Sequence, residues 1–267
     1  MNKMLTRKDR DRCNDLFRRY YGGRKFHDSL YTDLIRKYLV PQQRILDAGC
    51  GRYLTFCNEF SGVARVVGID LEKNLATNNS QPPFGVRGDV GTLPFRDGQF
   101  DLVISRSVIE HLEDPPRVFR EFARVLRPGG KVVIITPNKY DYVSLIAAIT
   151  PYRLHRFLVS WIFEVPEDDV FPTLYRANTL PAIRKAFRSA GLIPKDVRTI
   201  NHYPAYLMFS PTLFRLGVLY ERITSLELFR SLRSSILCVF EKPLGPSGAR
   251  EAAEGAHTVE GDRVEVA

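Results

Sequence analysis

The sequence has few of the residues that build metal centres or disulfide frameworks. It contains four cysteines in 267 residues, and no two of them stand at the spacing of a zinc-binding pair. They are Cys13, Cys50, Cys57 and Cys238. We predict reduced and mostly packed thiols, as in an intracellular protein, and no metal site.

Long apolar runs are also missing from the sequence. No uninterrupted stretch of about 18 apolar residues predicts a membrane-spanning helix. Residues 1–12 are dense in charge and lack the apolar core of a signal peptide. We therefore predict a cytoplasmic protein, and peripheral association with the inner face of an anionic membrane stays open.

Positive charge is what the chain has in excess. The formal net charge is +9, and residues 244–267 hold two arginines and five acids, a net of −3, which leaves +12 for the remainder. The acidic tail has scarcely any large apolar side chains, so we predict that it is disordered. The basic remainder suggests an anionic partner, either nucleic acid, phospholipid headgroups or a phosphorylated substrate. Charge that serves only solubility is the alternative.

One stretch, residues 44–53, organises the rest of the chain. A short apolar run leads into Gly49 and Gly51, which predicts a buried parallel strand that turns sharply into a helix. Glycine permits positive φ and lets the backbone approach a ligand closely. A dinucleotide-binding turn needs a third glycine where this chain has Leu54. Asp47 would also repel a pyrophosphate, so the turn favours a cationic or hydroxyl-rich ligand.

The pattern Asp47-x-Gly49-x-Gly51 resembles the first motif of class I S-adenosylmethionine-dependent methyltransferases. The resemblance implies that the acid contacts the methionine end of S-adenosylmethionine and that the two glycines line the cofactor site. Tyr53 stands where that family usually has a third small residue, a departure that would crowd the site. A tight strand–helix turn without a cofactor is the other interpretation.

Two later acids stand where such a fold would need them. Asp70 ends an apolar stretch about twenty residues after the glycines, where a doubly wound fold places an acid for ribose hydroxyls. A carboxylate can accept hydrogen bonds from both hydroxyls at once. Asp89 ends the next stretch, and the resemblance assigns it to the adenine amino group. Leu71 and Val90 follow these acids and complete this part of the predicted cofactor site.

Residues 99–105 predict the strand at the centre of the sheet, and Ser105 at its end joins the predicted cofactor site. The segment 106–112 resembles the same region of the methyltransferases of ubiquinone and menaquinone synthesis, the methyltransferase type 11 group. His111 is the best-placed general base, because ligands of α/β sheets bind beyond the carboxyl ends of the strands. A histidine that only hydrogen-bonds backbone at a helix end is the alternative. Weaker candidates for the acceptor side are Tyr20, Tyr21, His27, His155, Tyr175 and His202.

Strands that alternate with helices predict a parallel sheet with right-handed crossovers, and the resemblance implies the same fold. The predicted fold class is α/β, a doubly wound, Rossmann-like sheet of seven strands, mostly parallel with an antiparallel last strand at 236–241. Residues 1–243 form the methyltransferase domain, with an N-terminal helical cap at 1–40 and a helical insertion or lid at 139–178. Residues 244–267 form the disordered acidic tail.

Capping residues and turns predict several ends of elements. Asp28 or Ser29 caps the second N-terminal helix. Asp114 caps a helix that begins at Pro115, and residues 127–130 form a turn. The other predicted elements are helices at 5–20 and 179–190 and a strand at 197–201.

Two segments, 139–178 and 203–232, combine large apolar side chains with arginines. The first contains a helical face with Phe157 and Trp161 on the side away from Arg153, which fits a lid over the acceptor or a helix at a headgroup boundary. Core packing is the alternative for this helix. For the second segment, a flap, a dimer surface and a membrane-facing patch stay open, and so does the oligomeric state.

Three classes of function compete. The leading one is an S-adenosylmethionine-dependent methyltransferase for a small-molecule or lipid- or glycan-linked acceptor, by O- rather than C-methylation. The second is an RNA or protein methyltransferase. Against it, the sequence has no nucleic-acid recognition module and lacks the Asn-Pro-Pro-Tyr-like tetrad of base- and amide-modifying enzymes, so nucleic acid is the weaker partner. The third is a non-enzymatic or nicotinamide-binding Rossmann protein, which Leu54 and Asp47 disfavour.

Overall fold

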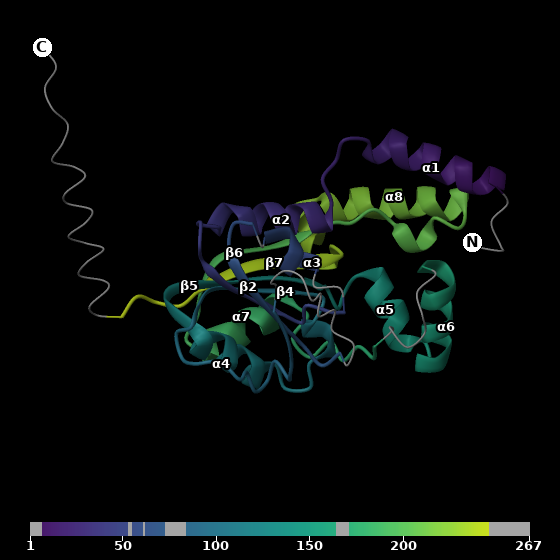
Figure 1. Cartoon of the computed structure of the whole chain (residues 1–267). Coiled ribbons are helices and arrows are strands. Elements are labelled where there is room, and N and C mark those ends of the chain that lie inside the picture. The colour runs from purple at the N-terminus through teal and green to yellow at the C-terminus, as the bar shows by residue number, and fades with distance from the viewer. Residues whose placement is uncertain (1–6, 53–54, 61, 73–83, 164–170, 246–267) are drawn as a thin grey trace, which may run out of the picture.

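A seven-stranded sheet forms the centre of the computed structural model, which describes residues 7–52, 55–60, 62–72, 84–163 and 171–245 (Figure 1). The strands are β1 (Arg44–Ala48), β2 (Arg65–Asp70), β3 (Phe84–Arg87), β4 (Phe100–Arg106), β5 (Leu126–Pro137), β6 (Ile193–Ile200) and β7 (Ser235–Glu241). Their order is β3-β2-β1-β4-β5-β7-β6. Strands β1 to β5 pair in parallel, whereas β7 pairs antiparallel with β5 and β6. The predicted fold class is confirmed.

Helices cover both faces of this sheet and extend past one edge of it (Figure 1). The helices are α1 (Arg7–Tyr21), α2 (His27–Tyr38), α3 (Thr55–Phe60), α4 (Pro115–Val125), α5 (Tyr142–Ile149), α6 (Tyr152–Phe163), α7 (Leu180–Ser189) and α8 (Pro211–Ser225). Short 3-10 helices occur at η1 (Ile109–His111), η3 (Ala205–Leu207) and η4 (Glu227–Leu232). Helices α2 and α3 pack on one face of the sheet, and α4 and α7 pack on the other.

The alternation of side chains along β5 divides the core into two layers. Val132 and Ile134 lie in the layer beneath α4 and α7, whereas Val133 and Ile135 lie in the layer beneath α2 and α3. Successive residues of a strand point to opposite faces, so a strand that is buried on both faces is a continuous apolar run. This is why these strands could be recognised in the sequence.

Three aromatic rings stack in the first of these layers. Phe119 of α4, Phe187 of α7 and Phe240 of β7 have ring centroids 4.0 and 4.2 Å apart, and the planes of neighbouring rings differ by 18° and 13°. All three side chains are fully buried. The stack therefore joins two helices to the antiparallel strand.

The N-terminal cap of α2 differs from the prediction. Its N-cap residue is Phe26, which makes no side-chain capping bond. Asp28 lies in the first turn instead, and its carboxylate accepts a hydrogen bond from Arg106 at 2.8 Å, so it is engaged by a residue distant in sequence. Asp114 caps α4 as predicted, and Thr179 caps α7.

Two strand boundaries also differ. The turn predicted at 127–130 lies within the bounds of β5, where Gly129 has φ +76° and donates its N–H to the carbonyl of Lys242 at 2.9 Å. That turn therefore stays hydrogen-bonded to the chain that follows β7. Strand β6 begins at Ile193, four residues earlier than predicted, because its first half contains Pro194 and is only partly buried, as in an edge strand.

The carboxyl ends of β1, β2, β4 and β5 meet at one edge of the sheet, and α1, α5, α6 and α8 gather beyond it (Figure 1). The predicted insertion at 139–178 supplies α5 and α6. Helix α1 of the predicted N-terminal cap packs against α8. Within the residues that the structure describes, no helix has the length and apolar character to span a bilayer. Most of the predicted tail, 246–267, lies outside those residues.

We expect Phe187→Ala to lower the free energy of unfolding by about 3–5 kcal/mol, because it empties the middle of the aromatic stack. Phe157→Ala is the matched control, since the Phe157 side chain on α6 is 54% exposed; it should change stability by about 0.5 kcal/mol or less. Urea unfolding followed by circular dichroism measures both. Equal losses would mean that the stack does not join the helices to the sheet.

Candidate active site

The turn after β1 is held against β2 and covered by the segment after β4. The N–H groups of Gly49 and Cys50 both donate to the carbonyl of Ile69, at 2.8 and 3.2 Å. Gly49 has φ +82° and Gly51 has φ +65°, in the region that favours glycine. A β-carbon on Gly49 would lie 2.0 Å from Cγ2 of Val108, whereas one on Gly51 would meet nothing within 4 Å. Position 49 therefore requires glycine for both conformation and space.

Asp70 lies at the end of β2, beside the glycine turn. Its Oδ2 accepts the N–H of Gly51 at 2.8 Å, and its Oδ1 accepts the N–H of Glu72 at 2.9 Å. Each carboxylate oxygen can accept two hydrogen bonds, so one position on each oxygen is left for a ligand hydroxyl. The same acid can thus fix the turn and bind a ribose diol. Leu71 is 67% exposed beside it and is open to a ligand.

Asp89 follows β3 and is held by its own loop. Its Oδ1 accepts the N–H of Gly91 at 2.8 Å, and the carbonyl of Gly91 accepts Nε of Arg117 at 2.7 Å. This loop holds the carboxylate in place while leaving it acceptor positions for a ligand amino group. Val90 is only 9% exposed and packs in the core, so it can offer a ligand little more than one edge.

Ser105 is predicted as a cofactor contact, and the structure places its hydroxyl inside the fold. Its side chain is fully buried, and its hydroxyl donates to the carbonyl of Ala48 at 2.9 Å. The hydroxyl therefore ties the end of β4 to the end of β1. Asp47 is also buried, and burial together with this acid raises the pKa of the Cys50 thiol. The thiol is accordingly protonated and is not a nucleophile.

His111 ends η1, directly after the central strand. Its Nδ1 lies 2.8 Å from the carbonyl oxygen of Pro172. A carbonyl can only accept, so Nδ1 carries the proton and the neutral ring has its lone pair on Nε2. The side chain is 31% exposed, and its ring meets that of Phe171 edge-on at 6.1 Å. This is the tautomer that a general base requires.

A buried carboxylate, Glu110, lies next to this imidazole. Its Oε2 accepts the hydroxyl of Thr136 at 2.9 Å, and its Oε1 lies 3.9 Å from Nε2 of His111. Burial raises the pKa of Glu110, and His111 opposes that shift. The hydroxyl oxygen of Thr136 in turn accepts a hydrogen bond from Nδ2 of Asn178 at 2.6 Å, which ties the end of β5 to the last residue of the insertion. The sequence reasoning missed Glu110.

A second imidazole–carboxylate pair lies at the same edge. Oδ1 of Asp28 lies 3.0 Å from Nδ1 of His27 and 2.8 Å from Nη1 of Arg106. The hydrogen bond from His27 and the charge of Arg106 hold the pKa of Asp28 well below its usual range. The sequence indicates His27 only as a weaker candidate for the acceptor side. It predicts Asp28 as a helix cap and does not indicate that this acid pairs with His27.

Asp141, the N-cap of α5, is another acid that the sequence reasoning missed. Its side chain is 4% exposed, and Oδ2 accepts the N–H of Val143 at 3.1 Å. Oδ1 has no hydrogen-bond partner among the described residues. Burial raises the pKa of Asp141 to about 6, although two backbone amides oppose the shift. Burial is the main cause that raises the pKa of the phenols of Tyr142 and Tyr206, and the charge of the nearby Asp141 contributes to the same shift.

Comparison with known proteins agrees with this arrangement. Residues 46–134 match the family model described as a methyltransferase domain. A probable S-adenosylmethionine-dependent methyltransferase of Mycolicibacterium smegmatis is 34% identical over 64% of this chain and 65% of that protein. Ubiquinone biosynthesis O-methyltransferase of Bordetella bronchiseptica is 28% identical over 63% of this chain and 69% of that protein. Phosphoethanolamine N-methyltransferase 1 of Arabidopsis thaliana is 36% identical over 36% of this chain, but only 21% of that enzyme's length is matched.

Solved structures show the same fold at low sequence identity. The YcgJ protein of Bacillus subtilis has a TM-score of 0.54 and 16% identity, over 82% of this chain and all of that one. Phosphoethanolamine N-methyltransferase 2 of Haemonchus contortus, in complex with S-adenosyl-L-methionine, has a TM-score of 0.52 and 18% identity, over 85% of this chain and 56% of that one.

The strand order, together with acids and a glycine turn at the carboxyl edge, defines the class I methyltransferase fold. Residues 46–134 therefore form a methyltransferase domain, and the chain is similar to S-adenosylmethionine-dependent methyltransferases while spanning less than two thirds of the length of most relatives that it matches.

The residues at the carboxyl edge fit S-adenosylmethionine. The position that a β-carbon would fill at Gly51 is open, and Asp70 beside it has acceptor positions left for ribose hydroxyls. Asp89 would accept the adenine amino group, and Asp47 would face the methionine end. When bound, the cofactor supplies a methyl group that its sulfonium makes electrophilic.

We expect Asp70→Ala to weaken S-adenosylmethionine binding by about 1.5–3 kcal/mol, or about 10- to 100-fold in Kd, because a charged acceptor and the bond that fixes Gly51 are both lost. Asp70→Asn, which keeps one acceptor oxygen, should lose less. Asp33→Ala removes an acid from the outer side of α2 and should leave Kd unchanged. Isothermal titration measures all three, and an unchanged Kd in Asp70→Ala would remove Asp70 from the site.

Asp141→Asn should stabilise the ligand-free protein near neutral pH. The folded-state pKa of about 6 lies above the ordinary value of 3.8, so the contribution of Asp141 is full at low pH and is lost as pH rises through about 6. The loss is at most about 3 kcal/mol. Asparagine is an equally good cap but has no charge to bury. In thermal unfolding between about pH 4 and 7.5, the melting temperature of Asp141→Asn should change less with pH than that of the wild type, so its pH profile should be flatter.

The matched control is Asp114→Asn, the same change at the exposed cap of α4. It should not flatten the profile. A variant Asp141→Asn that is less stable than the wild type at neutral pH would show that the carboxylate is ionised and paired there.

Proposed function

We propose that this chain transfers a methyl group from S-adenosylmethionine to an oxygen of a small-molecule or lipid-linked acceptor. The observation that supports this proposal is the arrangement at the carboxyl edge of the sheet. Asp70 and Asp89 keep acceptor positions there, and His111 presents an imidazole lone pair after the neighbouring central strand.

Methyl transfer from a sulfonium is a direct displacement, and its leaving group needs no proton. Holding donor and acceptor in line can lower the barrier by about 7–11 kcal/mol. A hydroxyl acceptor must also lose a proton, and a positioned base contributes about 10²–10⁴-fold. In this proposal Nε2 of His111 takes that proton while the carbonyl of Pro172 holds Nδ1–H. Glu110, 3.9 Å away, stabilises the imidazolium that forms.

The matched relatives are named for different acceptor atoms. One is an O-methyltransferase of ubiquinone biosynthesis, and another is a phosphoethanolamine N-methyltransferase. The lone pair on His111 favours an oxygen acceptor, because a hydroxyl requires deprotonation.

An amine acceptor is the second candidate, and Asp141 favours it. A buried carboxylate oxygen with no partner among the described residues is costly, and a neutral amine acceptor, which becomes an ammonium cation when its lone pair takes the methyl group, would compensate it. The ring of Tyr142 beside it could also contact a cation.

The proposal is tested by incubating the protein with methyl-labelled S-adenosylmethionine and extracts of lipids and of small metabolites. Mass spectrometry should find a labelled product, and fragmentation should locate the methyl group on oxygen. A methyl group on nitrogen would favour the second candidate. Label in RNA or protein instead would favour a macromolecular acceptor. No cofactor heat in titration calorimetry and no thermal shift with S-adenosylmethionine would reject methyl transfer.

We expect His111→Ala to lower turnover by about 10²-fold or more while cofactor affinity stays nearly unchanged. His111→Asn can still donate to the carbonyl of Pro172 but has no basic nitrogen, and His111→Gln keeps the bulk, so both should be nearly as impaired. Single-turnover kinetics with saturating cofactor measure the loss. If Asn or Gln retains most of the activity, His111 positions the segment at Pro172 and is not a base.

A further inference from the structure

Helix α8 exposes an apolar stripe that no described element covers. Leu213, Leu216, Leu219 and Ile223 recur at helical spacing and are 36%, 56%, 55% and 43% exposed. The opposite side of the helix is buried against α1, where Phe214 is fully enclosed. Helix α8 therefore has a second apolar face besides the one that holds it in the fold.

Helices α5 and α6, which lie at the same end of the molecule as α8, carry further exposed apolar side chains (Figure 1). Ile146, Ile149, Leu154 and Phe157 are 54%, 83%, 49% and 54% exposed. Helix α5 touches α8 directly, since the rings of Tyr142 and Tyr220 meet edge-on with centroids 5.1 Å apart. The exposed apolar groups of the three helices thus lie at the same end of the molecule, beyond the carboxyl edge of the sheet (Figure 1).

The charge on these three helices has one sign at the surface. Arg153, Arg156, Arg215 and Arg222 lie on them, and their single acid is Glu221. Glu221 is 5% exposed and is paired with Arg24 at 2.7 Å, so it does not offset the arginines at the surface. Apolar groups flanked by arginines, without exposed acids, complement an anionic lipid surface.

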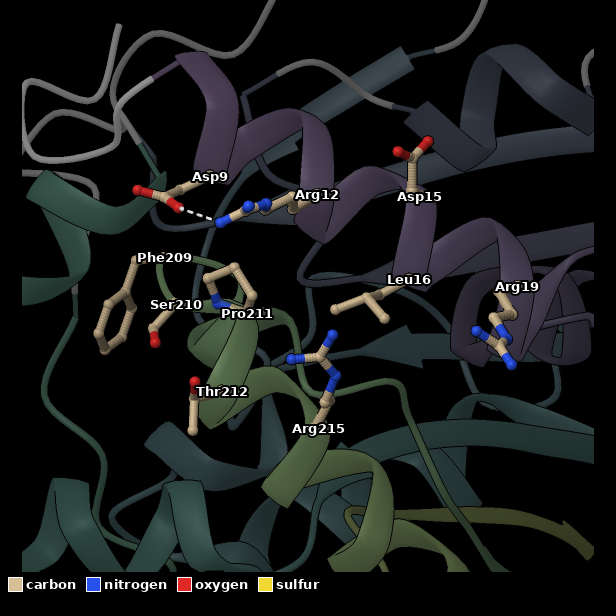
Figure 2. Close-up of a pocket in the computed structure, with 10 residues that line it drawn as sticks. All are labelled: Asp9, Arg12, Asp15, Leu16, Arg19, Phe209, Ser210, Pro211, Thr212 and Arg215. Carbon is tan, nitrogen blue, oxygen red and sulfur yellow. Dashed lines mark ion pairs between the residues drawn. The ribbon is translucent and has the colours of Figure 1, made fainter.

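A cavity between α1 and α8 adds a place for a headgroup (Figure 2). Its volume is about 710 Å³, and Arg12, Arg19 and Arg215 line it. Asp9 and Asp15 also line it, but Asp9 lies 3.9 Å from Arg12 and Asp15 pairs with a neighbouring arginine on α1 at 2.5 Å. Figure 2 shows the guanidinium of Arg215 directed from α8 toward α1 and the carboxylate of Asp15 pointing away from it.

We propose that α5, α6 and α8 form a docking surface for an anionic phospholipid bilayer, and that the arginine-lined cavity receives a headgroup phosphate. The exposed leucines, isoleucines and phenylalanine enter the headgroup boundary, and the arginines bind phosphates there. Docked in this way, the carboxyl edge of the sheet faces the membrane, where a lipid-linked acceptor would be found. The docking itself does not depend on methyl transfer.

Co-sedimentation of the full-length chain with vesicles tests the proposal without cofactor or acceptor. Vesicles of phosphatidylcholine mixed with phosphatidylglycerol should bind about tenfold or more of the protein that phosphatidylcholine alone binds. Added salt should release it, because surface charges are screened within about 10 Å at 0.1 M.

Paired variants separate the apolar and the basic contributions. Leu216→Ser with Leu219→Ser should reduce binding about tenfold, and so should Arg19→Glu with Arg215→Glu. The apolar control is Val40→Ser with Val63→Ser, since both valines are about half exposed at the opposite edge of the sheet. The charge control is Arg188→Glu on the exposed side of α7. Both controls should bind like the wild type, and circular dichroism should show that all variants fold.

Several results would overturn the proposal. One is equal binding to neutral and anionic vesicles. Another is a protein that does not bind vesicles but whose cavity arginines are protected by glycerol phosphate from chemical modification. That result would mean that the cavity binds a soluble phosphate compound. A dimer in light scattering that Leu216→Ser with Leu219→Ser dissociates, again without vesicle binding, would assign the apolar surface to a second copy of the chain. Binding to RNA instead of vesicles would assign the arginines to nucleic acid.

Discussion

The close approach of Gly49 to Val108 is the constraint on which the candidate active site depends. It lets the segment after β4 lie directly over the turn after β1, while Asp70 binds the same turn from β2. The ends of β1, β2 and β4 are thereby joined, and one of the joining groups is Asp70, a predicted cofactor ligand. An Asp70 that also binds the ribose diol, as predicted, makes cofactor affinity and the order of the turn depend on the same carboxylate.

The sheet could be predicted because its central strands are continuous apolar runs that end in glycine or an acid. Such runs are required where both faces of a strand are buried, as the two core layers beneath β5 show. The edge of the sheet follows other rules. Strand β6 contains Pro194 and is only partly buried in its first half, so the sequence of that half has no continuous apolar run and predicts a loop. The turn at 127–130 is likewise held by Lys242, a partner more than a hundred residues away.

The residues of the candidate site are of two kinds: some are positioned by nearby sequence, and others depend on contacts with distant segments. The positions of Asp70 and Asp89 could be predicted, because both acids stand at or just after the ends of apolar strands, and the backbone amides that bind them come from nearby loops and the adjacent turn. Glu110, Asp28 and Asp141 could not, since their roles depend on burial and on partners brought in by the fold. In a sequence, an acid before a helix indicates a cap, and only packing shows whether it is also desolvated.

The chain separates its charges between the interior of the site and the outer surface around it. Acids collect at the carboxyl edge, from Asp47 and Asp70 to Glu110 and Asp141, and arginines collect on the outer faces of α1, α6 and α8. A cation such as the sulfonium of the cofactor is therefore favoured inside, and an anion is favoured on the outside. Had the same net charge been spread evenly, each ligand would meet both signs. Under the two proposals, the excess of arginine serves the anionic surface partner, and the buried acids serve the cationic cofactor.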